Sequence, residues 1–233
     1  MSYGFFFDNS RCTGCKTCEL ACKDYKDLDA GILFRKVYDY EGGTWTQDED
    51  GAWTTTCFAY HVSVACNHCA SPACMAFCPE SAIVRDEETD LVRIDPEFCI
   101  GCGTCVKACP YEVPRLMKLE EPRLIEPEEP LPDELEEEQE ATEVIEIYEV
   151  AVKCDGCLNR VMLGKQPICV DACPLRALDF GDITVLQSHY GTITQIPPLP
   201  EPFTEPRLVI KPSAAAKGEG VDNGYVANIS EII

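Results

Sequence analysis

Four tight groups of cysteine constrain this chain of 233 residues more than any other feature. Sixteen of the seventeen cysteines belong to these groups, four to each, and three groups end in Cys-Pro. Thiols at such short spacing predict a fold organised largely by metal–sulfur bonds, because metal binding and folding are coupled in such sites. In chain order the groups are Cys12, Cys15, Cys18, Cys22; Cys66, Cys69, Cys74, Cys78; Cys99, Cys102, Cys105, Cys109; and Cys154, Cys157, Cys169, Cys173.

The spacing within the groups indicates which metal centre they hold. The run C-x2-C-x2-C-x3-C-P is typical of bacterial ferredoxins, in which thiolates bind [4Fe–4S] clusters. Residues 99–110 (CIGCGTCVKACP) match this run, and the first group departs from it only in having Lys23 in place of proline. The second group has four residues in its middle gap, and the fourth has eleven between Cys157 and Cys169. Four such groups predict four [4Fe–4S] clusters and a role in electron transfer.

Two other kinds of cysteine site compete with this interpretation. Structural zinc sites also use four cysteines, but they usually pair two C-x2-C knuckles rather than place three thiolates within seven residues. Disulfide frameworks suit short secreted chains, and C-x2-C-x2-C runs crowd the thiols too closely for bridges of normal geometry. We therefore favour clusters over both alternatives.

The ligand sets are expected to cross between groups. In two-cluster ferredoxins the fourth cysteine of each run binds the other cluster, since it lies one helical turn beyond the first three. Applied to this chain, the rule predicts a first site (Cys12, Cys15, Cys18, Cys173), a second site (Cys66, Cys69, Cys74, Cys109), a third site (Cys99, Cys102, Cys105, Cys78) and a fourth site (Cys154, Cys157, Cys169, Cys22).

The expected fold class is α+β, with two ferredoxin-like two-cluster modules in which short helices and β-hairpins surround the clusters. Cysteines four apart share one helix face, so each group is expected to end on a short helix. Residues 79–99 predict a β-hairpin, 36–56 two short strands, 57–65 a strand and 182–190 a helix. The predicted divisions are a module of residues 1–30 plus 150–182, a module of residues 57–118, a hairpin or loop insertion (31–56), an acidic insertion (119–149) and an extended C-terminal strap (183–233).

The net charge of −22 is concentrated in one segment. Residues 119–150 hold fourteen acidic side chains and one basic one. Such a run is typical of a solvated, mobile insertion, and the acidic balance argues against nucleic-acid binding, which needs a basic surface. The sequence has no apolar stretch of about 20 residues that could span a bilayer and no signal-peptide pattern. We expect any membrane contact to come through a partner protein.

A few single residues near the cysteines invite interpretation. Cys57, the odd cysteine, lies in an apolar run and is expected to be a buried thiol. His68 is expected to lie at the surface or to hydrogen-bond near a cluster rather than to bind iron. No nucleophile–base pair, phosphate loop or carboxylate pair indicates catalysis, so the isolated chain is not expected to be an enzyme. Charged residues that either offset cluster charge or are ordinary solvated side chains are Lys16, Lys107, Lys153 and Arg176.

Longer stretches around the cysteines resemble one family. The chain is similar to the electron-transfer subunits of membrane-bound molybdopterin oxidoreductases, most closely to the iron–sulfur (B) subunits of anaerobic dimethyl sulfoxide reductases. Some relatives have tryptophan in place of one cysteine of the third group and hold a [3Fe–4S] centre, whereas Cys102 and its neighbours are intact in this chain. The stretches that carry the resemblance are YGFFFDNSRCTGCKTCELACKDYKDL, CNHCASPACMAFCP, CIGCGTCVKACPY, KCDGCLNRV and KQPICVDACPLRALDFG.

The resemblance implies two partners, a catalytic subunit with molybdopterin and an integral membrane anchor that oxidises quinol. Electrons would pass from the third site to the second, the fourth and the first, and would reduce dimethyl sulfoxide or a similar S- or N-oxide. The implied location is peripheral on the cytoplasmic membrane, on its outer (periplasmic) face, with the cytoplasmic face as the alternative. A different interpretation is a free polyferredoxin, or a ferredoxin subunit linked to a hydrogenase or a formate enzyme.

Overall fold

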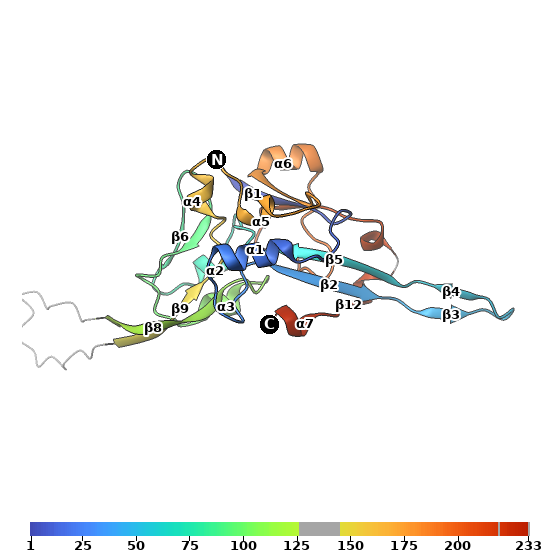
Figure 1. The fold of residues 1–233 in the computed structure, drawn as a ribbon, viewed down its shortest axis with the longest axis horizontal. Coiled ribbons are helices and arrows are strands. Elements are labelled where there is room, and N and C mark those ends of the chain that lie inside the picture. The colour runs from blue at the N-terminus through green and yellow to red at the C-terminus, as the bar shows by residue number, and fades with distance from the viewer. Residues whose placement is uncertain (126–144, 219, 233) are drawn as a thin grey trace, which may run out of the picture.

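The computed structural model describes residues 1–125, 145–218 and 220–232. Its body consists of short helices and small sheets, and two β-hairpins project from it at opposite ends (Figure 1). This mixture confirms the expected α+β class. No helix in the described part of the protein has the length and apolar character needed to cross a membrane.

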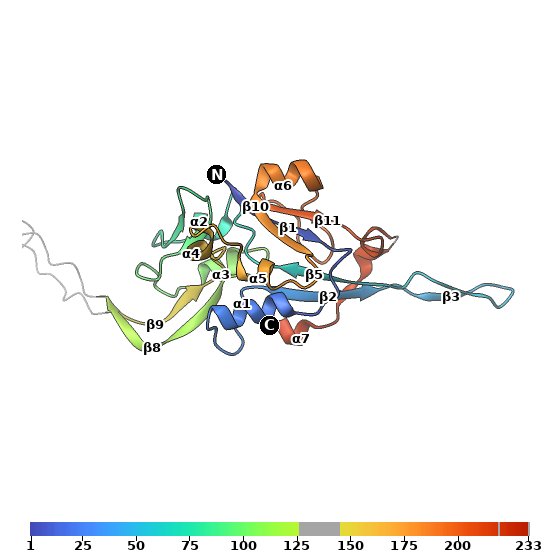
Figure 2. The same cartoon turned by 45° about the horizontal axis from the view of Figure 1, so that its top comes forward.

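A three-stranded sheet joins the two ends of the chain. Strand β1 (Tyr3–Asp8) lies in the middle, antiparallel to β10 (Leu178–Asp182) and parallel to β11 (Leu208–Lys211), and helix α6 (Ile183–Tyr190) packs on one face (Figure 2). Phe6 packs with the α6 side, while Phe5 and Phe7 face the main core. The run of three phenylalanines does not alternate with polar residues because both faces of the sheet are covered.

A second sheet carries the first projecting hairpin. Strands β2 (Lys36–Gly42) and β5 (Phe58–Val64) pair along their length, and β12 (Tyr225–Val226) adds to β2. The hairpin continues outward as β3 (Trp45–Gln47) and β4 (Trp53–Thr55). The prediction of two strands over 36–56 was wrong in number, since three lie there. Gly43, at a φ of +95°, bends the hairpin where a Cβ would meet the Thr56 carbonyl oxygen at 2.4 Å.

Short helices follow the cysteine loops, as expected. They are α1 (Thr17–Tyr25), α2 (Ala73–Ala76), α3 (Thr104–Ala108), α4 (Leu158–Val161) and α5 (Ile168–Asp171). Helix α1 packs on α5, and α2 packs on α3, so the first and fourth groups meet and the second and third groups meet. Helix α1 is the longest of the five because Lys23 stands where the other groups have a proline that would end the helix.

Two hairpins flank the second and third cysteine groups. The predicted hairpin forms from β6 (Ile83–Arg85) and β7 (Val92–Ile94). The other is β8 (Arg115–Ile125) with β9 (Ile145–Val152), and it covers both ends of the expected acidic insertion. The prediction of a mobile insertion over 119–149 was therefore wrong at these ends, because Ile147 and Val150 pack in the same apolar cluster as Cys99. Residues 126–144 lie outside the described residues.

The C-terminal segment is more than an extended strap. Strand β11 completes the central sheet because its Leu-Val-Ile run is buried there. Short 3-10 turns η2 (Ala215–Lys217) and η3 (Val221–Asn223) then lead to β12 and helix α7 (Ile229–Ile232). Asn228 holds this end on β2, since its side chain donates to the Val37 carbonyl at 2.9 Å and accepts from the Asp39 amide at 2.8 Å.

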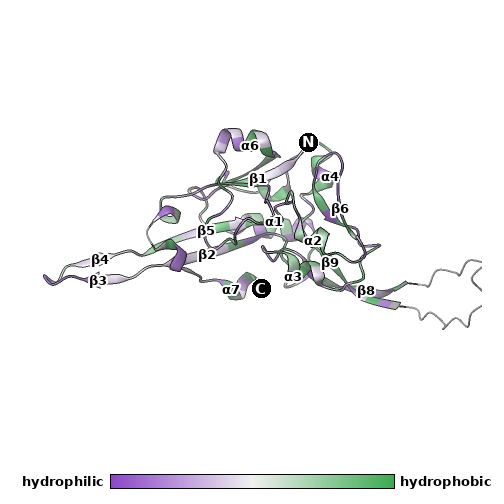
Figure 3. Cartoon of the chain, turned by 180° about the vertical axis from the view of Figure 1, so that it is seen from behind, coloured by the Kyte–Doolittle hydropathy of each residue, from purple (hydrophilic) through white to green (hydrophobic). Residues whose placement is uncertain are grey.

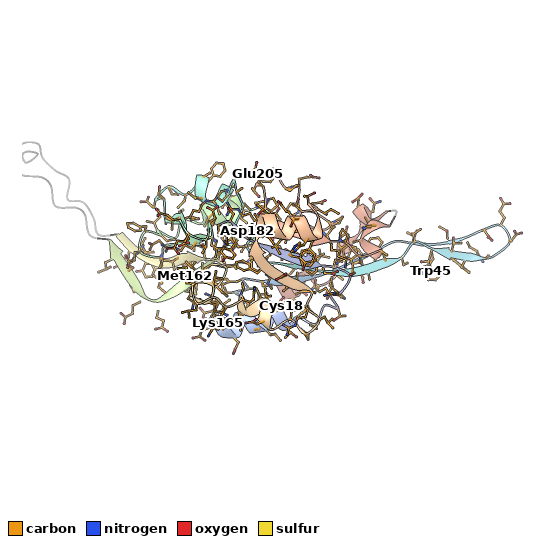
Figure 4. The ribbon with its side chains drawn as sticks, turned by 90° about the horizontal axis from the view of Figure 1, so that it is seen from above. Cys18, Trp45, Met162, Lys165, Asp182 and Glu205 are labelled. Atoms are coloured by element: carbon orange, nitrogen blue, oxygen red, sulfur yellow. The ribbon has the colours of Figure 1, made fainter. Side chains whose placement is uncertain are left out.

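The core lies in the body and includes the cysteines themselves. Apolar residues concentrate there, whereas the β3–β4 hairpin is pale, with purple at its tip (Figure 3). Side chains crowd the body around Cys18 and thin out towards Trp45 on the hairpin (Figure 4). Cys57 lies at the base of this hairpin, and its thiol is exposed. The prediction of a buried thiol was wrong because Cys57 precedes β5, outside the part of the apolar run that enters the core.

Asn228→Ala is expected to loosen the C-terminal segment without altering the body. The change leaves the Asp39 amide and the Val37 carbonyl without their partner, a loss of about 1–3 kcal/mol. Native-state hydrogen exchange on the anaerobic holoprotein should then show at least about tenfold faster exchange at the Asp39 amide. Asn223→Ala is the control, because this exposed asparagine belongs to the same segment. Equal protection of Asp39 in wild type and Asn228→Ala would contradict the proposed anchoring.

Candidate iron–sulfur sites

The first cavity lies between the N-terminal loop and the segment that follows α5. Cys12, Cys15 and Cys18 line it together with Cys173, which is distant in sequence. Strand β2 and the strand β5 residue Ser63 close its inner side. The structure therefore places together the four cysteines predicted for the first site.

Two further cavities have the same construction. The second-site cysteines line one of them, and the third-site cysteines line the other. In each cavity three cysteines come from one group and the fourth comes from the neighbouring group. These are Cys66, Cys69, Cys74 and Cys109 in the former, and Cys99, Cys102, Cys105 and Cys78 in the latter.

The cysteines of the fourth site also lie together. Cys22, Cys154, Cys157 and Cys169 are all buried. Burial raises the pKa of Cys22, and the nearby thiolates of Cys154, Cys169 and Cys157 raise it further. All four thiols thus share one buried region, which α1 and α5 bring together.

The loops that hold these thiols repeat one backbone conformation. The residue before the second cysteine of each group has a positive φ, and it is glycine in three groups and His68 in the second. Glycine is required where space is short, since a Cβ on Gly14 would meet the His61 ring at 2.5 Å and one on Gly101 would meet the Glu149 carbonyl oxygen at 2.2 Å. Each Cys-Pro step is followed by a turn with a positive-φ residue, at Ser81, Glu112 and Arg176.

Hydrogen-bond donors converge on the sulfur atoms. The backbone amides of Ala151, Gly156 and Ala177 donate to Cys99, Cys154 and Cys173 at 3.3, 3.4 and 3.3 Å. The Thr204 hydroxyl donates to Cys69 Sγ at 3.3 Å. Such donors favour thiolate over thiol and adjust the potential of a cluster that the sulfur binds.

Several thiols shielded from solvent and two exposed ones have pKa values shifted in opposite directions. Burial raises the pKa of Cys12, Cys69 and Cys105 to about 11 and that of Cys74 to about 12. The pKa of exposed Cys15 is lowered because the Thr17 hydroxyl donates to its sulfur. The pKa of exposed Cys102 is lowered by its hydrogen bond with Thr104. Buried thiols of this kind need a metal centre to replace their protons before they become thiolates.

Unpaired buried donors mark the second cavity as a place for an acceptor. The Asn67 side-chain nitrogen and the Tyr111 hydroxyl line this cavity, and both are buried without a hydrogen-bond partner in the structure. Buried polar groups without partners are rare in proteins. Four thiols with two free donors around one cavity fit the thiolate and sulfide acceptors of an iron–sulfur cluster. Within the described residues, no three His, Cys, Asp or Glu side chains converge on a single-ion site.

Three further polar residues lie among the sites. His68 is fully buried, so a surface position was wrong, and its Nδ1 accepts from the Val92 amide at 3.0 Å while Nε2 lies 4.0 Å from Cys154 Sγ. Lys153 donates to Cys66 Sγ at 3.5 Å. Burial raises the pKa of Cys66, but His68 and Lys153 outweigh it and lower that pKa below its usual range. Arg35 is also buried beside cysteines, and sequence reasoning missed it because no cysteine lies within twelve residues of it.

The other charged residues named from the sequence do not bring a buried charge to the sites. Lys107 and Arg176 are exposed. Lys16 lines the first cavity, but its ammonium group forms ion pairs with Glu231 and, at 3.9 Å, with Asp39. Of the four candidates, Lys153 is the one whose charge lies in the interior.

Gly101→Ala is expected to damage the third site selectively. The new Cβ would clash with the Glu149 carbonyl oxygen and push away the loop that carries Cys99 and Cys102. Iron and acid-labile sulfide per chain should fall by one cluster in anaerobically purified protein. Gly164→Ala is the matched control, because its φ of +70° is similar and a Cβ there meets nothing within 4 Å. Full iron content in Gly101→Ala, or the same loss in both variants, would refute the close-approach explanation.

Comparison with known proteins agrees with this chemistry. Family models described as 4Fe-4S dicluster domains match residues 57–122 and 98–178, and one described as a 4Fe-4S binding domain matches residues 9–26. The chain is 45% identical to the B subunit of anaerobic dimethyl sulfoxide reductase from Haemophilus influenzae, over 99% of this chain and 98% of the relative. It is 46% identical to the subunit of the same name from Escherichia coli over the same shares. The iron–sulfur subunit of the E. coli nitrate-inducible formate dehydrogenase is 28% identical over 75% of this chain and 52% of its own length.

These findings agree with the cavities described above, which bring cysteines of paired groups together. Near-complete coverage at this identity extends the likeness to the whole described body, including the C-terminal segment. The chain therefore belongs to the family of iron–sulfur B subunits of anaerobic dimethyl sulfoxide reductases.

Proposed function

We propose that this protein binds four [4Fe–4S] clusters and relays electrons through them one at a time. The observation that carries the proposal is the set of three cavities, each lined by three cysteines of one group and the fourth cysteine of its partner. Such clusters supply one-electron oxidation and reduction, and the protein supplies their ligands, their spacing and their surroundings. The proposed ligands are the sixteen cysteines of the first to fourth sites as defined above.

The same pairing supports a division into two modules. Residues 1–30 with 150–182 would hold the first and fourth sites, and residues 57–118 would hold the second and third. The packing of α1 on α5 and of α2 on α3 supports this proposal. Residues 31–56, 119–149 and 183–233 would then be additions, although the first and last of these also contribute strands to the sheets of the body.

The positions of exposed and buried cysteines support an order of the sites. Cys102 in the third site and Cys15 in the first are exposed, whereas the fourth-site cysteines are buried. The second and fourth sites adjoin through Lys153, which touches Cys66 and the Cys154 carbonyl. We infer an order of third, second, fourth and first site, with partners at the two exposed ends.

The relatives supply the identity of the partners in this proposal. A molybdopterin catalytic subunit would receive electrons at the first site and reduce dimethyl sulfoxide or a similar S- or N-oxide. An integral membrane anchor would oxidise quinol and deliver electrons at the third site. The protein would lie on the membrane surface through that anchor, on the outer face, with the cytoplasmic face as the alternative. Identity of 45% and 46% to dimethyl sulfoxide reductase subunits, against 28% to a formate dehydrogenase subunit, favours the S-oxide assignment.

Anaerobic affinity purification from native membranes tests the assignment. The proposal expects a molybdenum-containing subunit to co-purify, with turnover of dimethyl sulfoxide and about sixteen irons per chain. A brown protein recovered alone from the soluble fraction would instead indicate a free polyferredoxin. Co-purification with formate oxidation would indicate a formate-linked complex.

Cys102→Ser is expected to interrupt the relay at its entry. The substitution removes a ligand of the third site, so that cluster should be lost or converted. Quinol-driven turnover should fall by at least about tenfold, while turnover with an artificial donor that reaches the catalytic subunit directly should persist. The measurement compares both donors in the same membrane preparation.

Cys57→Ser is the matched control for this variant. Both cysteines are exposed, but Cys57 belongs to none of the four groups. All four clusters and both activities should remain. Loss of a cluster in Cys57→Ser, or unchanged quinol-driven turnover in Cys102→Ser, would show that the ligand assignment is wrong.

A further inference from the structure

Two buried cations lie between successive cluster sites. Arg35 is 2% exposed and Lys153 is 6% exposed. Among the residues that the structure describes, neither forms an ion pair with a carboxylate, whereas seven other lysine and arginine side chains do. An unpaired charge in a protein interior is costly, so each of these side chains needs another source of negative charge.

Arg35 lies between the first and fourth sites. Its Nη1 donates to Ser63 Oγ at 3.0 Å, and Ser63 Oγ lies 3.5 Å from Cys18 Sγ of the first site. Its guanidinium carbon stands 4.9 Å from the centre of the Phe5 ring. The Nε atom is buried without a hydrogen-bond partner in the structure. Burial by itself lowers the pKa of Arg35. The thiolates of both sites have a larger effect and raise this pKa. These thiolates are Cys169, Cys18, Cys154 and Cys22.

Lys153 lies between the second and fourth sites. Its Nζ donates to Cys66 Sγ of the second site at 3.5 Å and to the carbonyl oxygen of Cys154, a fourth-site residue, at 3.0 Å. A third bond goes to the Val92 carbonyl oxygen. The ammonium group therefore touches residues of both sites and, within the described residues, no carboxylate.

The thiolates are the anionic groups that remain near these two cations. A cluster held by four thiolates is an anion, and it gains one more negative charge when it is reduced. A positive charge nearby stabilises the reduced form more than the oxidised form, so it raises the reduction potential. The effect is strongest where water is excluded and screening is weak.

We propose that Arg35 and Lys153 act as fixed counter-charges to the clusters. Arg35 raises the reduction potentials of the first and fourth sites, and Lys153 raises those of the second and fourth. The fourth site, between both cations, gains from each. The third site gains from neither. This inference rests on the proposed four clusters and adds the assignment of which charge serves which site.

The test is an anaerobic redox titration of the purified membrane complex, followed by electron paramagnetic resonance. Arg35→Gln and Lys153→Gln should each lower two of the four potentials by about 59 mV, a tenfold change in a one-electron equilibrium. One of the lowered potentials should be common to both variants. The third-site signal, identified by its loss in Cys102→Ser, should shift in neither.

Charge-preserving variants and an exposed cation separate charge from packing. Arg35→Lys and Lys153→Arg keep the charge and should leave the potentials close to their wild-type values. Arg35→Met and Lys153→Met remove the charge and give the same test if a glutamine variant fails to assemble. Lys107→Gln removes an exposed charge beside the third site and should leave all four potentials in place. Unchanged potentials in a glutamine variant with full iron content would overturn the inference. Equal shifts at all four sites would overturn it too. A wild-type complex with fewer than four clusters would instead refute the proposed function.

Discussion

Each cluster cavity joins segments that are far apart in the sequence, and the rest of the fold depends on this joining. Cys12 and Cys173 line one cavity although 160 residues separate them. The sheets in the body are small, with two or three strands each. Bonds from thiolates to a shared metal centre would therefore act as cross-links across long loops, which limit the unfolded chain most strongly. The α1–α5 and α2–α3 contacts form where these cross-links would be made.

Burial of the thiols makes this dependence stronger. A thiol such as Cys74, with its pKa raised to about 12 by burial, stays protonated at neutral pH unless a metal centre displaces the proton. The same burial excludes the solvent that would otherwise stabilise a cluster's charge. Backbone amides and the Thr204 hydroxyl donate hydrogen bonds to the sulfur atoms and so stabilise this charge. Folding, metal binding and electrostatics at these sites are thus parts of one equilibrium.

Much of the site could be predicted from spacing, because cysteines with two or three residues between them lie on one short segment of the chain. The helices and the crossing of groups followed from the same local rule. Features that depend on distant contacts could not be predicted. Thr204 reaches Cys69 from 135 residues away, and Arg35 lies in no cysteine group. Strand β11 was missed because its pairing with β1 is decided by the sheet and not by the proline-rich residues before it.

The contrast between the ends and the middle of the proposed relay has a physical basis. At the exposed Cys15 and Cys102, threonine hydroxyls and solvent can stabilise negative charge, and the lowered pKa of each thiol reflects the hydroxyl. Arg35 and Lys153 are themselves buried, so there the positive charge comes from the protein's own side chains. A lysine or arginine buried without a carboxylate would destabilise an ordinary core, yet it is suited to a core whose counter-ions are thiolates.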